Sequence, residues 1–275
     1  MYYNKQESLS TALHKEEKCL SRELEWLLDT QLEPTLQLIK EHLEKAREVR
    51  VAASEVDTPV NTLALSSTNS DALKGFVKIS GFQLRRADLQ IRLPGFNKGH
   101  LFQCSLQPTK PYTLEQIQTS YNYLELAWEE LEFGRFPRYK DAVKNHLESI
   151  LDLINKGIES LNRLDEEKLF PNRVCDPKMF QPELPSDIVV QFYIKGSAVV
   201  ANALIIQLHQ SMPSSTGILR KKNTHKINEF KGMYAEITGE ITVETHCPSL
   251  AIALNGLTQA ANTCHEFLTK LSMFE

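Results

Sequence analysis

The stretch LPSDIVVQFYIKGSAVVANALIIQLHQ, residues 184–210, is the most apolar part of the chain, and its interpretation decides the fold. As a helix, residues 188–208 would be long enough to cross a lipid bilayer. Lys195 lies near the centre, where a charge costs about 2.5–3.5 kcal/mol even on a lenient insertion scale. Ser186 and Asp187 are typical of the N-cap of a helix in a soluble protein. The stretch therefore predicts a central helix of a helical bundle, apolar on most sides because neighbouring helices surround it.

The N-terminal 50 residues show the period of a long amphipathic helix. The stripe fits either a coiled-coil seam or a long helix that packs within its own chain. Pro34 removes one main-chain donor, so we expect it to kink this helix or split it in two. The apolar residues of the stripe recur at steps of three and four: Leu20, Leu24, Leu28, Leu32, Leu36, Ile39, Leu43 and Ala46.

The middle and the end of the chain predict three more helices. TLEQ, residues 113–116, has the form of a capping box, in which the side chains of Thr113 and Gln116 satisfy free main-chain donors. A second helix follows over residues 138–164, and the short break makes the two antiparallel neighbours. The last helix opens at Pro248 and continues to the end of the chain.

Two segments alternate with the period of a β-strand. Residues 56–108 contain short alternating runs, separated by turn formers such as Ser80-Gly81, as in a small antiparallel meander of three or four strands. Residues 235–243 alternate without a break, with apolar residues on one face and Glu and Thr on the other, as in a strand with one wet face.

These elements predict an α+β fold: an elongated antiparallel helical bundle with a separate small antiparallel β domain formed by two insertions. The bundle would comprise residues 1–52, 112–210 and 248–275, and its first and last helices would share contacts. The β domain would comprise residues 56–108 and 212–247.

Composition and charge narrow the class of protein. A hydrophobic fraction of 41% is ordinary for a soluble globular protein, and a net charge of −4 argues against a dedicated nucleic-acid binder. The five cysteines are odd in number and include no C-x-x-C, which is typical of free thiols in a reducing compartment. The polar N-terminus lacks the apolar core of a secretory signal. We therefore expect a cytoplasmic protein.

Motifs for catalysis or cofactor binding are missing from the sequence. It contains no phosphate-binding loop, no G-x-S-x-G elbow, no H-E-x-x-H and no dinucleotide fingerprint. The neighbours His246-Cys247 and Cys264-His265 do not easily bind one metal ion, because adjacent side chains diverge on a strand or a helix. We therefore expect no enzyme activity, no cofactor and no metal, and a role as a scaffold or adaptor that acts through a binding surface.

Two long connectors are the candidate partner-binding segments. Residues 165–186 carry four prolines, and we take Phe180 and Glu183 there as candidate contact residues. Residues 211–226 form a polar and basic loop. Its candidate contact residues are Arg220, Lys221 and Lys222.

Three stretches resemble, in this order, the Rogdi family, whose fungal members are the second subunit of the RAVE complex. They are ELEWLLDTQLEPTLQLIKEHLEKA (23–46), MFQPELPSDIVVQFYIKGSAVVANALIIQLH (179–209) and ITVETHCPSLAIALNGLTQAANTCHEFLTKLSMF (241–274). M-F-x-P-x-L-P-S-D before an apolar stretch is the most specific of them. The resemblance extends over nearly the whole chain and includes no catalytic motif.

This resemblance implies a non-enzymatic function. The implied partners are a large WD-repeat scaffold, a Skp-type adaptor in fungi, and the peripheral ATP-hydrolysing sector of the V-type H⁺-ATPase, which the complex helps to reassemble onto its membrane sector. The implied location is the cytoplasm, with recruitment to vacuolar and endosomal membranes and only indirect or peripheral membrane contact. No nucleic-acid partner is implied.

A second hypothesis comes from the leucine stripe and from the label of leucine-zipper protein that animal members of the family carry. The chain would then be a homodimeric coiled-coil adaptor or tether unrelated to the proton pump. Pro34 interrupts the stripe and so argues against a continuous parallel zipper.

Overall fold

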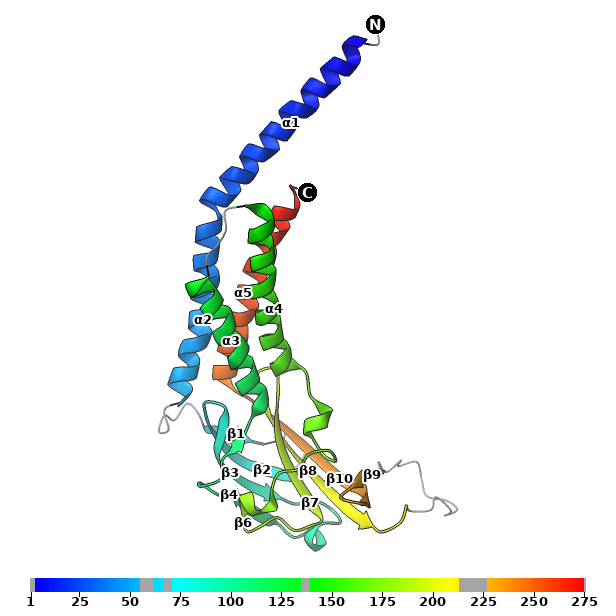
Figure 1. The fold of residues 1–275 in the computed structure, drawn as a ribbon. Helices are drawn as coiled ribbons and strands as arrows, with labels where there is room; N and C mark the ends of the chain where they lie inside the picture. The colour runs from blue at the N-terminus through cyan, green and yellow to red at the C-terminus, as the bar shows by residue number, and fades with distance from the viewer. Residues whose placement is uncertain (1–2, 55–61, 67–70, 135–138, 213–226, 275) are drawn as a thin grey trace. The chain divides into compact units, whose positions relative to one another are not determined.

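A computed structural model confirms the α+β class (Figure 1). Within the residues that the structure describes, 3–54, 62–66, 71–134, 139–212 and 227–274, it has five α-helices and two antiparallel sheets. The chain forms two compact units, each defined by contacts among its own residues. The helical unit comprises residues 1–48, 120–159 and 252–275, and the β unit comprises residues 49–119 and 160–251.

The helices begin and end close to the expected positions. The two helices expected in the middle of the chain and the one expected at its end are confirmed. The five are α1 (Tyr3–Thr30), α2 (Leu32–Ser54), α3 (Glu115–Phe133), α4 (Lys140–Asn162) and α5 (Pro248–Ser272).

The N-terminal helix is split, as Pro34 predicted. The break falls at Gln31, one turn before the proline, because Pro34 has no N–H to donate to the carbonyl of Thr30. Thr35 Oγ1 also donates to the carbonyl of Gln31 at 2.7 Å, a back-bond that favours bending. Within the helical unit, α1 extends beyond α2 and stands clear of the other helices (Figure 1).

The core of the helical unit lies between α2, α3, α4 and α5. The expected contact between the first and last helical blocks is present, because the main chain at Gly256 lies directly against that of His42. Fully buried side chains come from every one of these helices, among them Ile39, Leu43, Leu124, Ile150, Leu257 and Phe267.

The β unit contains a six-stranded and a four-stranded sheet. The first has the order β1-β2-β3-β4-β6, with β5 paired to β3; the second has the order β7-β8-β10-β9. The strands are β1 (Thr62–Leu65), β2 (Leu73–Ser80), β3 (Gln83–Ile91), β4 (Phe102–Leu106), β5 (Tyr112–Thr113), β6 (Phe180–Gln181), β7 (Ile188–Lys195), β8 (Ala198–His209), β9 (Ile227–Phe230) and β10 (Met233–His246), with a short 3₁₀ helix, η2 (Asn97–Gly99).

Both β predictions are confirmed. Strands β1 to β4 form the expected antiparallel meander, and β10 covers the alternating run at 235–243. A bulge between Ile237 and Gly239 interrupts the pairing of β10 with β8.

The helix predicted over residues 188–208 is wrong. The segment forms the β7–β8 hairpin, which turns at Gly196 and Ser197 and pairs Lys195 with Ala198. Gly196 has a φ of 62°, in the left-handed region that the turn requires and that glycine adopts without strain. The segment that was expected to form a central helix of the bundle therefore belongs, by its contacts, to the β unit.

The hairpin lacks alternation because both of its faces are covered. On one face Val190, Phe192 and Ile194 are buried in the main core of the β unit. On the other face Val189 and Leu204 lie in a second apolar cluster that includes Phe170 of the connector. A strand buried on both faces is an unbroken apolar run, and its periodicity does not distinguish it from a buried helix. Among the helices of the described part of the chain, none combines the length and apolarity that a membrane crossing requires.

Candidate partner-binding surface

The connector between α4 and β7 is ordered by short local structures. It contains two single-turn 3₁₀ helices, η3 (Glu166–Lys168) and η4 (Pro177–Met179), followed by β6. The carboxylates of Asp165 and Asp176 cap these turns by accepting from the main-chain N–H groups two residues further on, at 3.1 and 3.0 Å. Each of the two turns in the connector is thus fixed by its own aspartate.

Main-chain hydrogen bonds attach the connector to both sheets. Gln107, directly after β4, donates to the carbonyl of Met179 at 2.7 Å, and Ile206 of β8 donates to the carbonyl of Asp187 at 2.9 Å. Earlier in the connector, the ring of Phe170 packs against that of Phe230, with 5.2 Å between centroids. The connector therefore presents a surface of defined shape.

The outer edge of β7 is closed by side chains instead of another strand. The Cys175 thiol donates to the carbonyl of Val190 at 2.9 Å. The Tyr112 hydroxyl donates to the carbonyl of Phe192 at 3.1 Å and accepts from its N–H at 3.4 Å. An exposed strand edge is a template for pairing with another chain, and these contacts block that edge.

Gln116 completes this closure. Its Oε1 accepts from the N–H of Ile194 at 2.7 Å, and its Nε2 donates to the carbonyl of the same residue at 2.9 Å. The predicted capping box is therefore wrong: Thr113 lies in β5, paired with Gln83, and the Gln116 amide is bonded to β7. The tertiary contact satisfies two main-chain groups of a buried strand, which a local cap would leave without partners.

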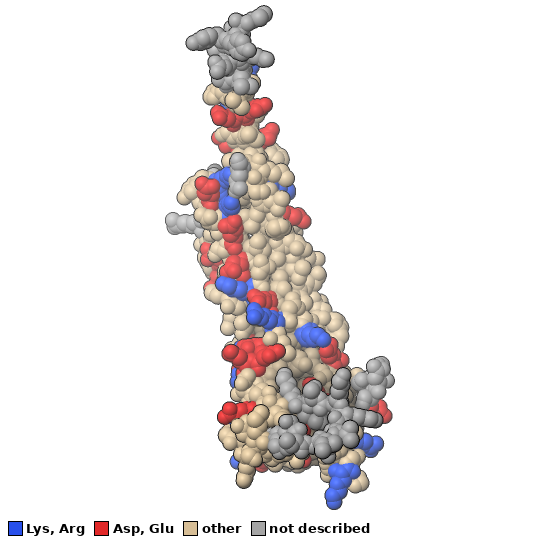
Figure 2. Space-filling model, turned by 90° about the vertical axis from the view of Figure 1, so that its right-hand side faces the viewer, with Lys and Arg blue, Asp and Glu red and all other residues tan. Residues whose placement is uncertain are grey.

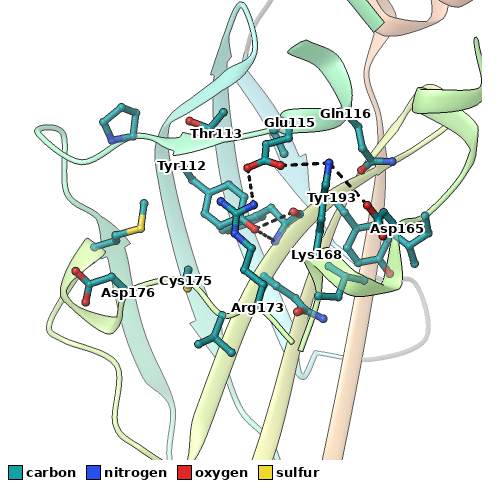
Figure 3. A pocket seen from close by; sticks show the side chains of 18 residues that line it. Tyr112, Thr113, Glu115, Gln116, Asp165, Lys168, Arg173, Cys175, Asp176 and Tyr193 are labelled. Atoms are coloured by element: carbon teal, nitrogen blue, oxygen red, sulfur yellow. Dashed lines mark hydrogen bonds and ion pairs between the residues drawn. The ribbon is translucent and has the colours of Figure 1, made fainter. Parts of the chain in front are cut away.

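A cleft of about 290 Å³ lies along this edge (Figure 3). Its walls are β5 and the start of α3, the connector and the middle of β7. Tyr112 and Tyr193 contribute apolar surface, and Gln191 reaches it from inside the sheet. A volume near the lower limit for ligand sites suits one side chain of a partner better than a large molecule.

A network of charges borders the cleft. Glu115, on the first turn of α3, binds Arg173 at 2.5 Å and Lys168 at 3.3 Å, and Lys168 lies 3.8 Å from Asp165 (Figure 3). The hydrogen bond from Arg173 and the second one from Lys168 lower the pKa of Glu115. The Glu115 side chain is 32% exposed and those of Lys168 and Arg173 are more exposed, so the network is open to a charged partner.

The titratable groups behind this network stay protonated at neutral pH. Burial raises the pKa of the Tyr112 hydroxyl and of the Cys175 thiol to about 12. A thiol in that state is a poor nucleophile and acts here as a hydrogen-bond donor. In the described part of the chain, no group of three His, Cys, Asp or Glu side chains lies close enough to hold a metal ion.

The structure places the candidate contact residues in three different situations. Phe180 is buried in β6, where it pairs with Leu106, so its ring serves the core and is not available to a partner. Glu183 is exposed on the connector. The basic candidates Arg220, Lys221 and Lys222 lie outside the described residues.

Sequence reasoning missed the residues that close the β7 edge. Tyr112 and Gln116 flank the start of α3, and Cys175 lies in the connector, so the group comes together only when the chain folds. The one local signal was the pair Tyr112-Thr113 before the helix, which has the residue types of a strand.

Comparison with known proteins identifies the family. A family model described as "Rogdi leucine zipper containing protein" matches residues 23–234. The chain belongs to the Rogdi family. It is 25% identical to the human "Protein rogdi homolog" over 284 aligned residues, which cover 97% of this chain and 96% of the relative. The zebrafish (Danio rerio) homolog is 23% identical over 97% of both chains, and "Protein rogdi" of Drosophila melanogaster is 23% identical over 93% of this chain and 88% of the relative.

The Rogdi match begins at residue 23, so it includes only the last two turns of α1. It covers all of α2 and extends into β10, and thus includes the connector and the β7–β8 hairpin. The residues that close the β7 edge therefore all lie in the part of the chain that the Rogdi model matches.

Proposed function

We propose that the protein is a non-enzymatic subunit of a RAVE-like complex. In this role it binds a WD-repeat scaffold and, in fungi, a Skp-type adaptor. The complex promotes assembly of the peripheral ATP-hydrolysing sector of the V-type H⁺-ATPase onto its membrane sector. Membership of the Rogdi family over nearly the whole chain is the observation that carries this proposal. The proposed location is the cytoplasm, with recruitment to vacuolar or endosomal membranes through partners.

The geometry of the connector supports a role in binding. An assembly factor must hold two bodies together and then release them, which favours several contacts of moderate strength over one very tight site. The exposed network of Glu115, Lys168 and Arg173 and the exposed Glu183 can provide such contacts. We assign this surface, together with the basic loop at 214–222, to the scaffold or to the pump.

The test is affinity purification of the tagged full chain from its own cells, followed by mass spectrometry. We expect a large WD-repeat protein together with peripheral-sector subunits of the proton pump. Recovery of the protein alone, or with unrelated partners, would overturn the proposal.

A second purification tests the basic loop at residues 214–222. Deleting residues 214–222 should reduce recovery of the scaffold or of the pump subunits. Alanine at Arg85 and Lys98, two exposed cations of the β unit, is the control and should change nothing.

One observation favours the second candidate function, a homodimeric coiled-coil tether. Leu20 of the leucine stripe and Leu13, seven residues before it, are 48% and 52% exposed, so no other described part of the chain covers them fully. Light scattering on the purified protein separates the two functions. A dimer that becomes a monomer when Leu13 and Leu20 are changed to Gln supports the tether, and a monomer at all concentrations supports the adaptor.

A further inference from the structure

A groove in the helical unit lies at the break between α1 and α2. It has a volume of about 710 Å³ and is lined by the end of α1, the first two turns of α2 and the C-terminal end of α3. This volume is within the range of sites that bind ligands or side chains of partners. At Gln31 the axis of α1 turns away from that of α2 (Figure 1).

The apolar part of the groove is a row of leucines on its floor, whereas most of its exposed lining is polar. Leu28, Leu32 and Leu36 follow one another at steps of four and form a row that crosses the helix break. Leu131 of α3 faces this row from the other side of the groove. Leu28 and Leu131 are only half-buried, whereas Leu32 and Leu36 are 7% and 8% exposed, so the floor is open at one end.

The rim of the groove is acidic. Asp29 and Glu33 are exposed four residues apart on the same flank of the leucine row, and within the described residues neither carboxylate forms an ion pair. The lysine of the rim, Lys40, is already bound to Glu132 of α3 and lies 5.7 Å from the Trp128 ring centroid. On the face that Figure 2 displays, the helical part carries both acidic and basic side chains.

We propose that this groove binds an amphipathic helix of a partner protein, with its apolar face on the leucine row and basic side chains beside Asp29 and Glu33. An apolar row with residues four apart is complementary to helical anchors at i, i+4 and i+7. Lysine or arginine next to the anchors supplies the counter-charges that the rim lacks. An acidic or neutral helix would leave these carboxylates without partners and would bind more weakly.

The inference rests on the proposed function only in that the protein works by binding other proteins. Its test uses purified full chain and two synthetic 14-residue peptides, so a failure would not affect the pump-assembly role. Both peptides carry leucine on one helical face; the other face carries lysine in the first peptide and glutamate in the second. Fluorescence anisotropy should show at least tenfold tighter binding of the leucine–lysine peptide.

Two pairs of variants distinguish the groove from a general attraction of a cationic peptide to an acidic protein. Replacing Asp29 and Glu33 by Lys should weaken binding of the leucine–lysine peptide at least tenfold and strengthen binding of the leucine–glutamate peptide. The control replaces Glu148 and Glu266 by Lys, since both are exposed on other helices of the same unit. It makes the same change in net charge and should leave binding nearly unchanged.

Replacing Leu28 and Leu131 by Gln tests the floor. Binding of the leucine–lysine peptide should fall at least tenfold while circular dichroism confirms an intact fold. Equal losses in the groove and control variants would overturn the proposal. So would a dimer, detected by light scattering, that the Leu28→Gln and Leu131→Gln changes convert to a monomer, because a second copy of the chain would then occupy the groove.

Discussion

The side-chain amide of Gln116 forms a two-way hydrogen-bonded pair with the main chain of Ile194: Oε1 accepts from the N–H at 2.7 Å, and Nε2 donates to the carbonyl at 2.9 Å. A neighbouring strand would form the same pair of bonds. The side chain of one helical residue thus takes the place of a strand at the edge of β7.

Removing this amide should destabilise the protein. Gln116→Leu leaves the N–H and C=O of the fully buried Ile194 without partners, and each orphaned group costs about 1–3 kcal/mol. We expect the free energy of unfolding in urea, followed by circular dichroism, to fall by about 2–4 kcal/mol. Gln118→Leu on the exposed side of the same helix is the control, with a change within about 0.5 kcal/mol. Equal stability of the two variants would show that Ile194 finds other partners.

Two glycines in helices should respond in opposite directions to alanine. At Gly157 an added Cβ meets atoms no closer than 3.5 Å, so Gly157→Ala gains helix propensity and should stabilise by up to about 1 kcal/mol. At Gly256 the Cβ would lie 2.8 Å from the main-chain oxygen of His42, so Gly256→Ala must push α5 away from α2. We expect a loss of about 1–3 kcal/mol.

Thermal unfolding of both variants beside the natural protein measures this contrast. A stabilising Gly256→Ala would contradict the close packing of α2 and α5 at this point.

The ion network on α3 should make stability depend on acid pH. Arg173 lowers the pKa of Glu115 below its ordinary value of 4.5 in the folded protein. A depressed pKa contributes stability that is present above the unfolded value and is lost as the pH falls through the folded value.

Glu115→Gln should therefore be less stable than the natural protein above about pH 4.5, and the two curves should converge at lower pH. Urea unfolding from pH 3 to pH 7 measures the difference, and added salt should reduce it. Glu183→Gln, at an exposed site of the same connector, is the control. A constant gap between the curves for Glu115→Gln at every pH would exclude the ion pairs as its cause.

The cysteines should react in two classes. Cys19 is exposed on α1, whereas burial raises the pKa of Cys104, Cys175 and Cys264 to about 12 and Cys247 is 4% exposed. Only about one buried thiol in ten thousand with such a pKa is ionised at pH 8, so its reaction with a disulfide reagent is slow. We expect one fast thiol in the folded protein and five after unfolding in denaturant.

Cys19→Ser should remove the fast phase of that reaction completely. A second fast thiol in this variant would mean that a buried cysteine is reached by opening of its surroundings.

Helices and strands could be assigned from the sequence wherever one face of the element is exposed to solvent. The stripe from Leu32 to Ala46 predicted α2, and the alternation from Ala235 to Val243 predicted β10, because burial on one side gives each element its own period. Pro34 likewise predicted the split of the first helix, since the loss of an N–H acts locally.

The conformation of the buried segment at residues 188–209 was decided by the tertiary structure. Residues 188–209 form a hairpin because the main core covers one face of β7 and Phe170 of the connector covers the other, and a strand without a wet face has no alternation. Tyr112, Gln116 and Cys175 close its edge from positions 15 to 80 residues away in the chain. The sequence by itself thus determined each element with a solvent-facing side, whereas the elements buried on all sides, and the side chains that satisfy their main chain, were decided only by the folded chain that surrounds them.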